Sequence, residues 1–224
     1  MKNLQQLTGL GMAMALFSLC HQSPAAIDVS FVAGEGGGYS ATWTGTQAIP
    51  DNTDSGLAFN LTFADTGLQI SSVSVSFNIS GGWNGDLHGY LSHGDGSVLL
   101  LNRVGNGTYG NPGFDIVLTD GGNADFANYQ DHSPIYNGND QLTGSWQAQG
   151  GATAFGDAFT QADPSGTWTL FFADKSPLDV STIVSWSVDL TAITAVPEPA
   201  TWAGIAFATI FGSVQLVRQL RKRN

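Results

Sequence analysis

The sequence predicts an all-β protein, an antiparallel β-sandwich of the jelly-roll type. Two segments, Val73–Ile79 and Val184–Leu190, alternate apolar and polar residues with a period of two, as expected of strands that bury one face. In the second segment Val184, Trp186 and Leu190 belong to the predicted buried face. Charged residues make up only 11% of the chain, and 29 of its 224 residues are glycine. Short apolar runs separated by turn residues complete the pattern, which favours a sandwich over a helical or alternating α/β fold.

The expected elements follow one another along the chain with Gly, Asn, Asp or Pro between them. Near the start, Asp28–Val32 and Tyr39–Thr44 predict an edge hairpin across the glycine run Gly36–Gly38. A single helical turn is expected at Ala152–Phe159. The remaining strands are expected at Leu57–Phe63, Val73–Ile79, Leu87–Ser92, Val98–Asn102, Phe114–Leu118, Thr167–Ala173 and Val184–Leu190.

The first residues have the order of a secretory signal peptide. Lys2 precedes the apolar run Leu7–Cys20, and small residues follow it. Cleavage after Ala25, with Ser23 three positions from the cut, fits best, and cleavage after Ala26 is the alternative. A buried helix of the fold is a further reading of the same run.

Cys20 is the only cysteine in the chain. A lipid-modified Cys20 is an alternative that the preceding Leu19 disfavours, because a lipoprotein signal has a small residue there. If Cys20 leaves with the signal peptide, neither disulfides nor thiolate chemistry are available to the exported chain.

The last residues combine a proline-rich break, an apolar run and a basic end. The uncharged segment Ala200–Val217 would span about 27 Å as a helix, enough to cross a bilayer core. The basic cluster that follows would remain cytoplasmic, which places the body of the chain on the other side of the membrane. This cluster consists of Arg218, Arg221, Lys222 and Arg223.

The motif Val196, Pro197, Glu198, Pro199, followed by this apolar run and basic cluster, resembles a PEP-CTERM sorting signal. The resemblance implies recognition by an exosortase, a membrane enzyme of exopolysaccharide-producing Gram-negative bacteria, and processing near the Pro-Glu-Pro. The inner-membrane precursor would then mature to a form at the cell surface or in the extracellular matrix. A plain C-terminal membrane anchor is the alternative.

The body of the chain contains an ordered series of short motifs. They are Ile49–Asn52, Ile70–Ile79, Gly85–Leu87, Tyr90–His93, Gly96–Leu100, Leu142–Trp146, Phe155–Phe159, Gly166–Leu170 with Asp174, and Ser185–Val188. In this order and spacing they resemble the P domain (P/Homo B) of proprotein convertases. The resemblance implies a jelly roll, related to galactose-binding-like sandwiches, that accompanies subtilisin-like proteases without carrying their catalytic residues. The loops at 105–113 and 121–140 depart from the family pattern, so no loop site is transferred.

These features divide the chain into consecutive parts. We expect a signal peptide at 1–25, edge strands and a linker at 26–48, and a P-domain-like jelly roll at 49–192. A Pro-Glu-Pro linker at 193–199, a transmembrane helix at 200–217 and a basic cytoplasmic tail at 218–224 follow.

No catalytic residue is predicted. The chain has no room for a subtilisin-like catalytic domain beside the sandwich, and the G-x-S-x-G and H-E-x-x-H motifs are absent. His88 or His93 with Ser92 or Ser97 could form a base and nucleophile, but serines are so frequent that such pairs arise by chance. Trp83 is a candidate for stacking on a sugar, with packing at a strand start as the alternative.

The exported body is strongly acidic, which makes calcium the one cofactor worth considering. Removing both termini takes away five of the 7 basic residues but only one of the 18 acidic residues, so the formal net charge changes from −11 to −15. Hard cations bind carboxylate and carbonyl oxygens, which Asp-rich loops supply. The segment that contains Asp51 and Asp54 fails as an EF-hand. The candidate calcium ligands at strand ends and in loops are Asp86, Asp115, Asp120, Asp125 and Asp174.

The sequence therefore predicts an exported, non-catalytic β-sandwich that an exosortase sorts to the cell surface or matrix. The negative charge disfavours nucleic acid, and it argues against binding an acidic polymer unless cations bridge the contact. Extracellular polysaccharide and a separately encoded protease are the candidate partners of the domain. Two alternatives remain: a P-domain accessory to a separately encoded serine endopeptidase, and a carbohydrate-binding module.

Overall fold

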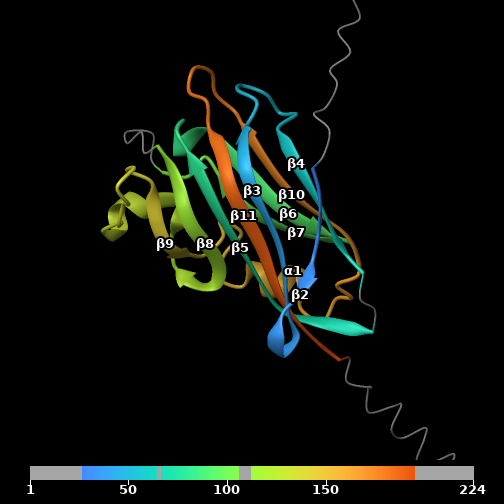
Figure 1. Cartoon of the computed structure of the whole chain (residues 1–224). Coiled ribbons are helices and arrows are strands. Elements are labelled where there is room, and N and C mark those ends of the chain that lie inside the picture. Colours follow the sequence, from blue (N-terminus) through green and yellow to red (C-terminus); the bar gives the residue numbers. More distant parts are fainter. Residues whose placement is uncertain (1–26, 65–66, 106–111, 195–224) are drawn as a thin grey trace, which may run out of the picture.

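Two β-sheets pack face to face in the computed structural model, which describes residues 27–64, 67–105 and 112–194 (Figure 1). Sheet A has the strand order β1-β4-β10-β6-β7 and sheet B the order β2-β3-β11-β5-β8-β9. The predicted all-β sandwich is thereby confirmed. The strands are β1 (Ile27–Ser30), β2 (Val32–Ala33), β3 (Gly38–Ala48), β4 (Leu57–Phe63), β5 (Leu68–Ser80), β6 (Leu87–His93), β7 (Gly96–Asn102), β8 (Gly113–Asn123), β9 (Leu142–Trp146), β10 (Gly166–Asp174) and β11 (Thr182–Thr194).

Most neighbouring strands run antiparallel, as predicted, but the pairs β1–β4 and β8–β9 are parallel. The two long strands β5 and β11 lie side by side in the middle of sheet B and form its most extensive pairing. Both correspond to segments whose alternation identified them as strands, and both extend several residues beyond the alternating part.

The core lies between the sheets and is rich in aromatic side chains. Alternate residues of the long strands β5 and β11 point inward, and the buried residues of both sheets form one hydrophobic layer between them. Aromatic rings from both sheets meet there in edge-to-face contacts, as between Phe59 and Trp186 and between Phe77 and Phe172. The largest fully buried side chains are Trp168, Trp186, Tyr129, Phe59, Phe114, Phe126, Phe155, Phe159, Phe172, Ile49, Leu61 and Ile70.

The last strand contains one departure from the predicted alternation. A register shift between Ile183 and Ser185 interrupts the pairing of β11 with both β3 and β5. This β-bulge changes the phase of the side chains, so Ile183 is buried and Val184 is 37% exposed. The assignment of Val184 to the buried face was therefore wrong, whereas Trp186 and Leu190 are buried as predicted.

The N-terminal strands join both sheets. β2 and β3 form the predicted antiparallel pair across the 3-10 turn η1 (Glu35–Gly37), where Gly36 and Gly37 have φ values of 69° and 79°. β3 is not at an edge, however, because it lies between β2 and β11. The expected strand Asp28–Val32 is divided, and its first half, β1, pairs with β4 of sheet A.

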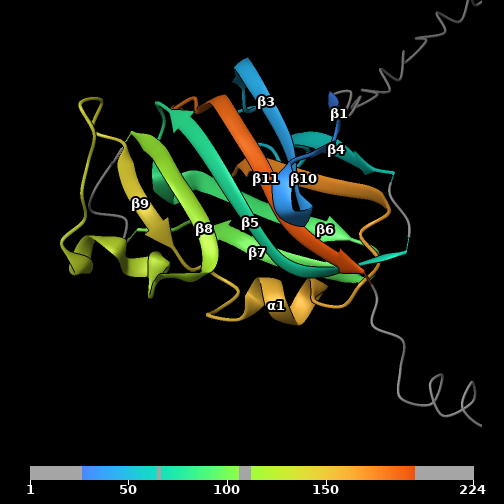
Figure 2. The same ribbon diagram turned by 60° about the horizontal axis from the view of Figure 1, so that its bottom comes forward.

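Short helical segments connect some of the strands. The predicted helical turn is present as α1 (Ala154–Phe159), which lies next to β5 and β7 and buries Phe155 and Phe159 (Figure 2). The 3-10 segments η2 (Asn84–Asp86) and η3 (Phe126–His132) precede β6 and follow β8.

The predicted signal peptide and membrane segment lie outside the described residues. This holds for Ser23, Ala25, Val196, Pro197, Glu198, Pro199, Arg218, Arg221, Lys222 and Arg223. Within residues 27–194, where described, none of the helices has the length and apolar character needed to span a membrane.

Candidate functional site

Five aspartates and both basic residues of the body meet at one end of sheet A, in loops that the strands bring together. β6 and β10 pair so that Leu87 lies opposite Asp174, while β10 and β4 pair so that Leu57 lies opposite Phe172. The loops before β4 and β6 and after β7 and β10 therefore end at the same place. We call this group the acidic corner: Asp51, Asp54, Asp86, Asp174, Asp179, Arg103 and Lys175.

Asp174 is the most deeply buried member of the acidic corner, with no exposed surface. Its Oδ1 accepts a hydrogen bond of 3.2 Å from the main-chain N–H of Ser176. Its Oδ2 is also buried but has no hydrogen-bond partner in the described part of the chain. Burial raises the pKa of the Asp174 carboxyl above its usual value, and the nearby charges of Asp86, Asp51 and Asp179 add to this shift.

Asp86 approaches the same place from η2 and is 8% exposed. A guanidinium nitrogen of Arg103 lies 3.6 Å from Asp86 Oδ1, and that arginine side chain is 54% exposed. Arg103 also donates hydrogen bonds to the carbonyl oxygen of Gly85 at 3.0 Å and to Ser176 Oγ at 2.9 Å. Arg103 thus connects the loops around Asp86 and Asp174 from the solvent side.

The loop before β4 is fastened to the loop after β10. The main-chain N–H of Thr53 donates to the carbonyl oxygen of Asp174 at 2.9 Å, and that of Leu178 donates to Asp51 Oδ2 at 3.2 Å. Lys175 pairs with Asp54, and this hydrogen bond lowers the pKa of the exposed Asp54 carboxyl. Both basic residues of the body are therefore already engaged with acidic partners other than Asp174.

The other predicted calcium ligands lie elsewhere and apart from one another. Asp120 accepts hydrogen bonds from the first turn of α1. Asp125 contacts Asn128 and His132, and Asp115 lies on β8 within 3.5 Å of Asn137 Nδ2. Of the five predicted ligands, the structure brings together Asp86 and Asp174 alone.

The acidic corner adds Asp51 and Asp179 to that pair. Asp51 stood out in the sequence only as part of a failed EF-hand pattern, and Asp179 was not singled out at all. Their proximity to Asp174 depends on strand pairing between distant segments, which no local pattern reveals. Across the described ranges there is no group of three or more His, Cys, Asp or Glu side chains already in position to hold a metal ion.

The two histidines considered as bases, His88 and His93, lie against main-chain groups or buried surroundings. The ring nitrogens of His93 lie 3.1 and 2.8 Å from the carbonyl oxygens of Thr167 and Asp163. Ser92 lies opposite Ser97 in the β6–β7 pairing, and neither serine contacts an imidazole among the described contacts. Burial lowers the pKa of His88, whose Nδ1 has no partner among the residues the structure describes. Trp83, the candidate for sugar stacking, is 42% exposed beside the acidic corner.

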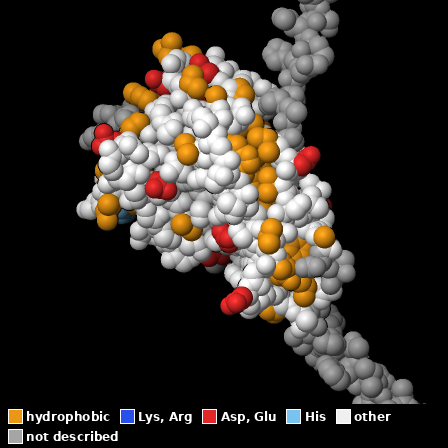
Figure 3. All heavy atoms as spheres, viewed as in Figure 1, with side chains coloured by type: hydrophobic (Ala, Val, Ile, Leu, Met, Phe, Trp, Pro, Cys, Tyr) orange, Lys and Arg blue, Asp and Glu red, His pale blue; other side chains and the backbone are white. Residues whose placement is uncertain are grey.

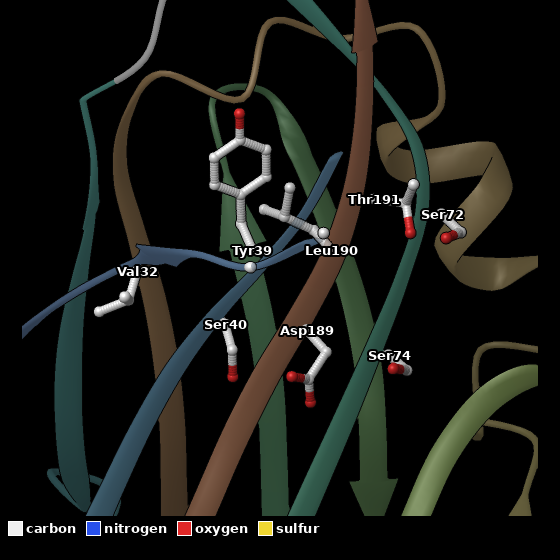
Figure 4. A pocket seen from close by; sticks show the side chains of 10 residues that line it. Val32, Tyr39, Ser40, Ser72, Ser74, Asp189, Leu190 and Thr191 are labelled. Atoms are coloured by element: carbon white, nitrogen blue, oxygen red, sulfur yellow. The ribbon is translucent and has the colours of Figure 1, made fainter. Parts of the chain in front are cut away.

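The outer face of sheet B is a second candidate surface, made mostly of small hydroxyl side chains. Figure 3 shows this face as largely uncharged, with scattered acidic groups. On β11, Asp189 lies opposite Ser40 of β3 and Ser74 of β5, and it accepts a hydrogen bond of 2.7 Å from Ser187 Oγ. Figure 4 shows Ser40, Asp189 and Ser74 side by side on neighbouring strands. They line a depression of about 320 Å³. We call this surface the hydroxyl face: Ser40, Thr42, Thr44, Ser72, Ser74, Ser76, Ser185, Ser187, Asp189 and Thr191.

The solved structures that this chain is similar to include two of low sequence identity. One is the complex of the Aeromonas sobria serine protease with a chaperone, with a TM-score of 0.41 and 13% identity over 70% of this chain and 26% of that chain. The other is the Aeromonas sobria serine protease, with a TM-score of 0.38 and 14% identity over 67% of this chain and 26% of that chain. This chain thus spans about a quarter of the length of either structure.

No protein-family model and no curated protein sequence matches the chain.

Proposed function

We propose that the chain is an exported, non-catalytic β-sandwich domain that is sorted through its C-terminal signal to the cell surface or the exopolysaccharide matrix. The observation that supports this best is the position of the two predicted processing sites. Ala25 lies two residues before the start of β1 at Ile27, and Pro197 lies three residues after the end of β11 at Thr194. Cleavage at both sites would leave every described strand intact.

This position matters because the last strand is central. β11 lies between β3 and β5 and supplies Trp186 and Val188 to the core, so processing upstream of Thr194 would remove part of the sandwich. Pro197 and Pro199 each lack a main-chain N–H and disfavour continuation of the strand or entry into a helix.

The surface of the domain suits a hydrated polysaccharide matrix. Serine and threonine hydroxyls both donate and accept hydrogen bonds, as sugar hydroxyls do, and the hydroxyl face presents them on adjacent strands. The same face has few charges, whereas the acidic groups gather mainly in loops. A neutral polymer would therefore meet little electrostatic repulsion there.

The sorting claim is tested by changing the one acidic residue of the motif in a host that contains an exosortase. In cells that produce Glu198→Ala, we expect the full-length precursor to accumulate in the inner membrane, whereas the unchanged chain matures and leaves it. Glu35→Ala is the matched control, because Glu35 is the only other glutamate and is exposed in η1. Normal maturation of Glu198→Ala, seen by immunoblotting of membrane and extracellular fractions, would refute the sorting claim.

A second candidate function is that of an accessory domain to a serine endopeptidase. It is supported by the P-domain-like motifs, because most of them fall on strands of one sandwich, namely β5, β6, β7, β9, β10 and β11, and another falls on α1. Co-purification of a subtilisin-like protease with the chain from the culture medium would favour this function. Recovery of the chain with exopolysaccharide alone would favour the first.

A further inference from the structure

The buried carboxylate of Asp174 lacks a compensating partner for one of its two oxygens. Asp174 has no exposed surface, and Ser176 satisfies only Oδ1. A buried carboxylate without a partner is strongly unfavourable, so such groups are paired, protonated or bound to a metal ion. Lys175 and Arg103 are engaged with Asp54 and Asp86, and no ion pair to Asp174 occurs in the described part of the chain.

Three further aspartates add negative charge at the end of sheet A where Asp174 lies. Asp51, Asp86 and Asp179 lie on the loops before β4 and β6 and after β10, and their charges add to the rise in the pKa of the Asp174 carboxyl. Against them stands Arg103, whose contact with Asp86 is long at 3.6 Å and half exposed to solvent. Such an exposed ion pair contributes little to stability, so Asp86 can exchange Arg103 for another cation at small cost. The acidic corner thus has an excess of oxygen ligands and of negative charge.

We propose that the acidic corner binds one calcium ion, with Asp174 Oδ2 as the buried ligand and Asp86 as the second carboxylate. Calcium accepts six to eight oxygen ligands in irregular arrangements, including main-chain carbonyls and water, whereas magnesium requires a near-octahedral set. Zinc favours Cys and His ligands, and the body has no cysteine once Cys20 is removed. The donor set of the acidic corner therefore fits calcium best.

The exposed aspartates complete the site from two loops. Asp51 and Asp179 lie on the loops before β4 and after β10, and Leu178 N–H already connects these loops through Asp51 Oδ2. Because no three acidic side chains of the described residues are gathered at ligand distance beforehand, binding draws at least one of these loops inward. Calcium would then fasten together the ends of β4, β6 and β10.

The alternative is that Asp174 is a neutral, protonated side chain whose only role is to bond the loop at Ser176. The two accounts differ in their response to calcium and to Asp174→Asn. Asparagine retains an oxygen that accepts the Ser176 N–H but has no charge. If Asp174 is a calcium ligand, Asp174→Asn removes its charge and weakens calcium binding. If Asp174 is a neutral structural side chain, Asp174→Asn keeps its hydrogen bond and changes little.

The test uses the full chain, purified in mild detergent and freed of metal with a chelator, and calcium chloride as the probe. We expect one saturable binding event by isothermal titration calorimetry. At about a hundredfold excess over the dissociation constant, the melting temperature should rise by roughly 5–10 °C. Magnesium chloride at the same concentration should give a smaller rise. Absence of both heat and melting shift with calcium would overturn the proposal.

Two substitutions distinguish calcium binding at the acidic corner from non-specific attraction of calcium to an acidic protein. Asp174→Asn should lose most of the calcium-dependent rise while melting no lower than the unchanged chain without calcium, since the buried charge is gone. Asp95→Asn is the control, because Asp95 is exposed in the β6–β7 turn at the other end of the sheet, and it should keep the full rise. A full calcium response in Asp174→Asn would also overturn the proposal.

If Asp174→Asn fails to fold, Asp179→Asn provides the second variant. Asp179 is exposed, so its substitution leaves the core untouched. We expect it to weaken calcium binding by roughly tenfold through the loss of one carboxylate. An unchanged dissociation constant would show that the acidic corner does not hold the ion.

Discussion

The imidazole of His93 stacks on the indole of Trp168, with ring centroids 4.3 Å apart and planes inclined by 8°. The two ring nitrogens of His93 lie within 3.1 Å of the carbonyl oxygens of Thr167 and Asp163. His93 therefore fastens the end of β6 to β10 and to the loop before it, and its role is structural.

Replacement of His93 by alanine should lower the free energy of unfolding by about 1–3 kcal/mol, through loss of the stacking and of the polar contacts. Chemical denaturation of His93→Ala beside His93→Phe measures this effect. The phenylalanine variant retains an aromatic ring and should fall between the alanine variant and the unchanged chain. Equal stability of all three would show that the ring does not fasten these strands.

Asp120 stabilises the start of α1. Its carboxylate oxygens accept hydrogen bonds of 3.0 and 2.8 Å from the main-chain N–H groups of Phe155 and Gly156. Asp120→Ala should lower the free energy of unfolding by about 1–2 kcal/mol, because two donors of the first helical turn lose their acceptor. Asp131→Ala, a change at an exposed aspartate in η3, is the control and should cost less than about 0.5 kcal/mol. An equal cost for both changes would contradict the capping role.

Two fully buried tryptophans differ in hydrogen bonding. Trp168 Nε1 donates to the carbonyl oxygen of Pro164 at 2.9 Å, whereas Trp186 Nε1 has no partner among the described residues. Substitution of either by phenylalanine leaves a cavity, but only Trp168→Phe leaves a carbonyl oxygen without its donor. Trp168→Phe should therefore be more destabilising than Trp186→Phe by about 1–2 kcal/mol in urea denaturation. The opposite order would show that the Pro164 hydrogen bond contributes nothing.

Tyr129 makes the domain sensitive to high pH. Burial raises the pKa of its phenol from 10.0 to about 12, although Asn84 Nδ2 donates to its oxygen at 3.1 Å. The unfolded chain loses this proton at lower pH than the folded one. The stabilising contribution is complete below about pH 10 and is lost as the pH rises toward 12.

Melting temperatures between pH 9 and 12 measure this contribution, with Tyr129→Phe as the reference. Relative to Tyr129→Phe, the melting temperature of the unchanged chain should fall steadily as the pH rises over that interval. A constant difference would mean that Tyr129 does not titrate on unfolding.

The fold could be predicted from the sequence where alternation is uninterrupted. In β4 and β5 the period-two pattern coincides with one buried and one exposed face, and local residues suffice to place them. The pattern failed at Val184, because the β-bulge there depends on pairing with β3 and β5 and has no local signal. The division of the first predicted strand between two sheets is also a consequence of long-range pairing.

The candidate site was predictable only in part for the same reason. Their position at the ends of predicted strands marks Asp86 and Asp174 as potential ligands. Asp120 also follows a predicted strand, but it caps a helix instead. The approach of Asp51 and Asp179 to Asp174 requires β4, β6 and β10 to be adjacent, which only the strand order reveals. The residue type thus indicated carboxylate ligands for a cation, whereas the strand order determines which aspartates lie at the same end of the sheet.

The proposed function depends most on processing at the two boundaries of the sandwich. Intact-mass spectrometry of the chain recovered outside the producing cells tests this processing directly. We expect one species that begins at Ala26 or Ile27 and ends near Pro197, with β1 through β11 complete. A species that retains the basic cluster 218–223, or one that ends within β11, would refute processing at these boundaries.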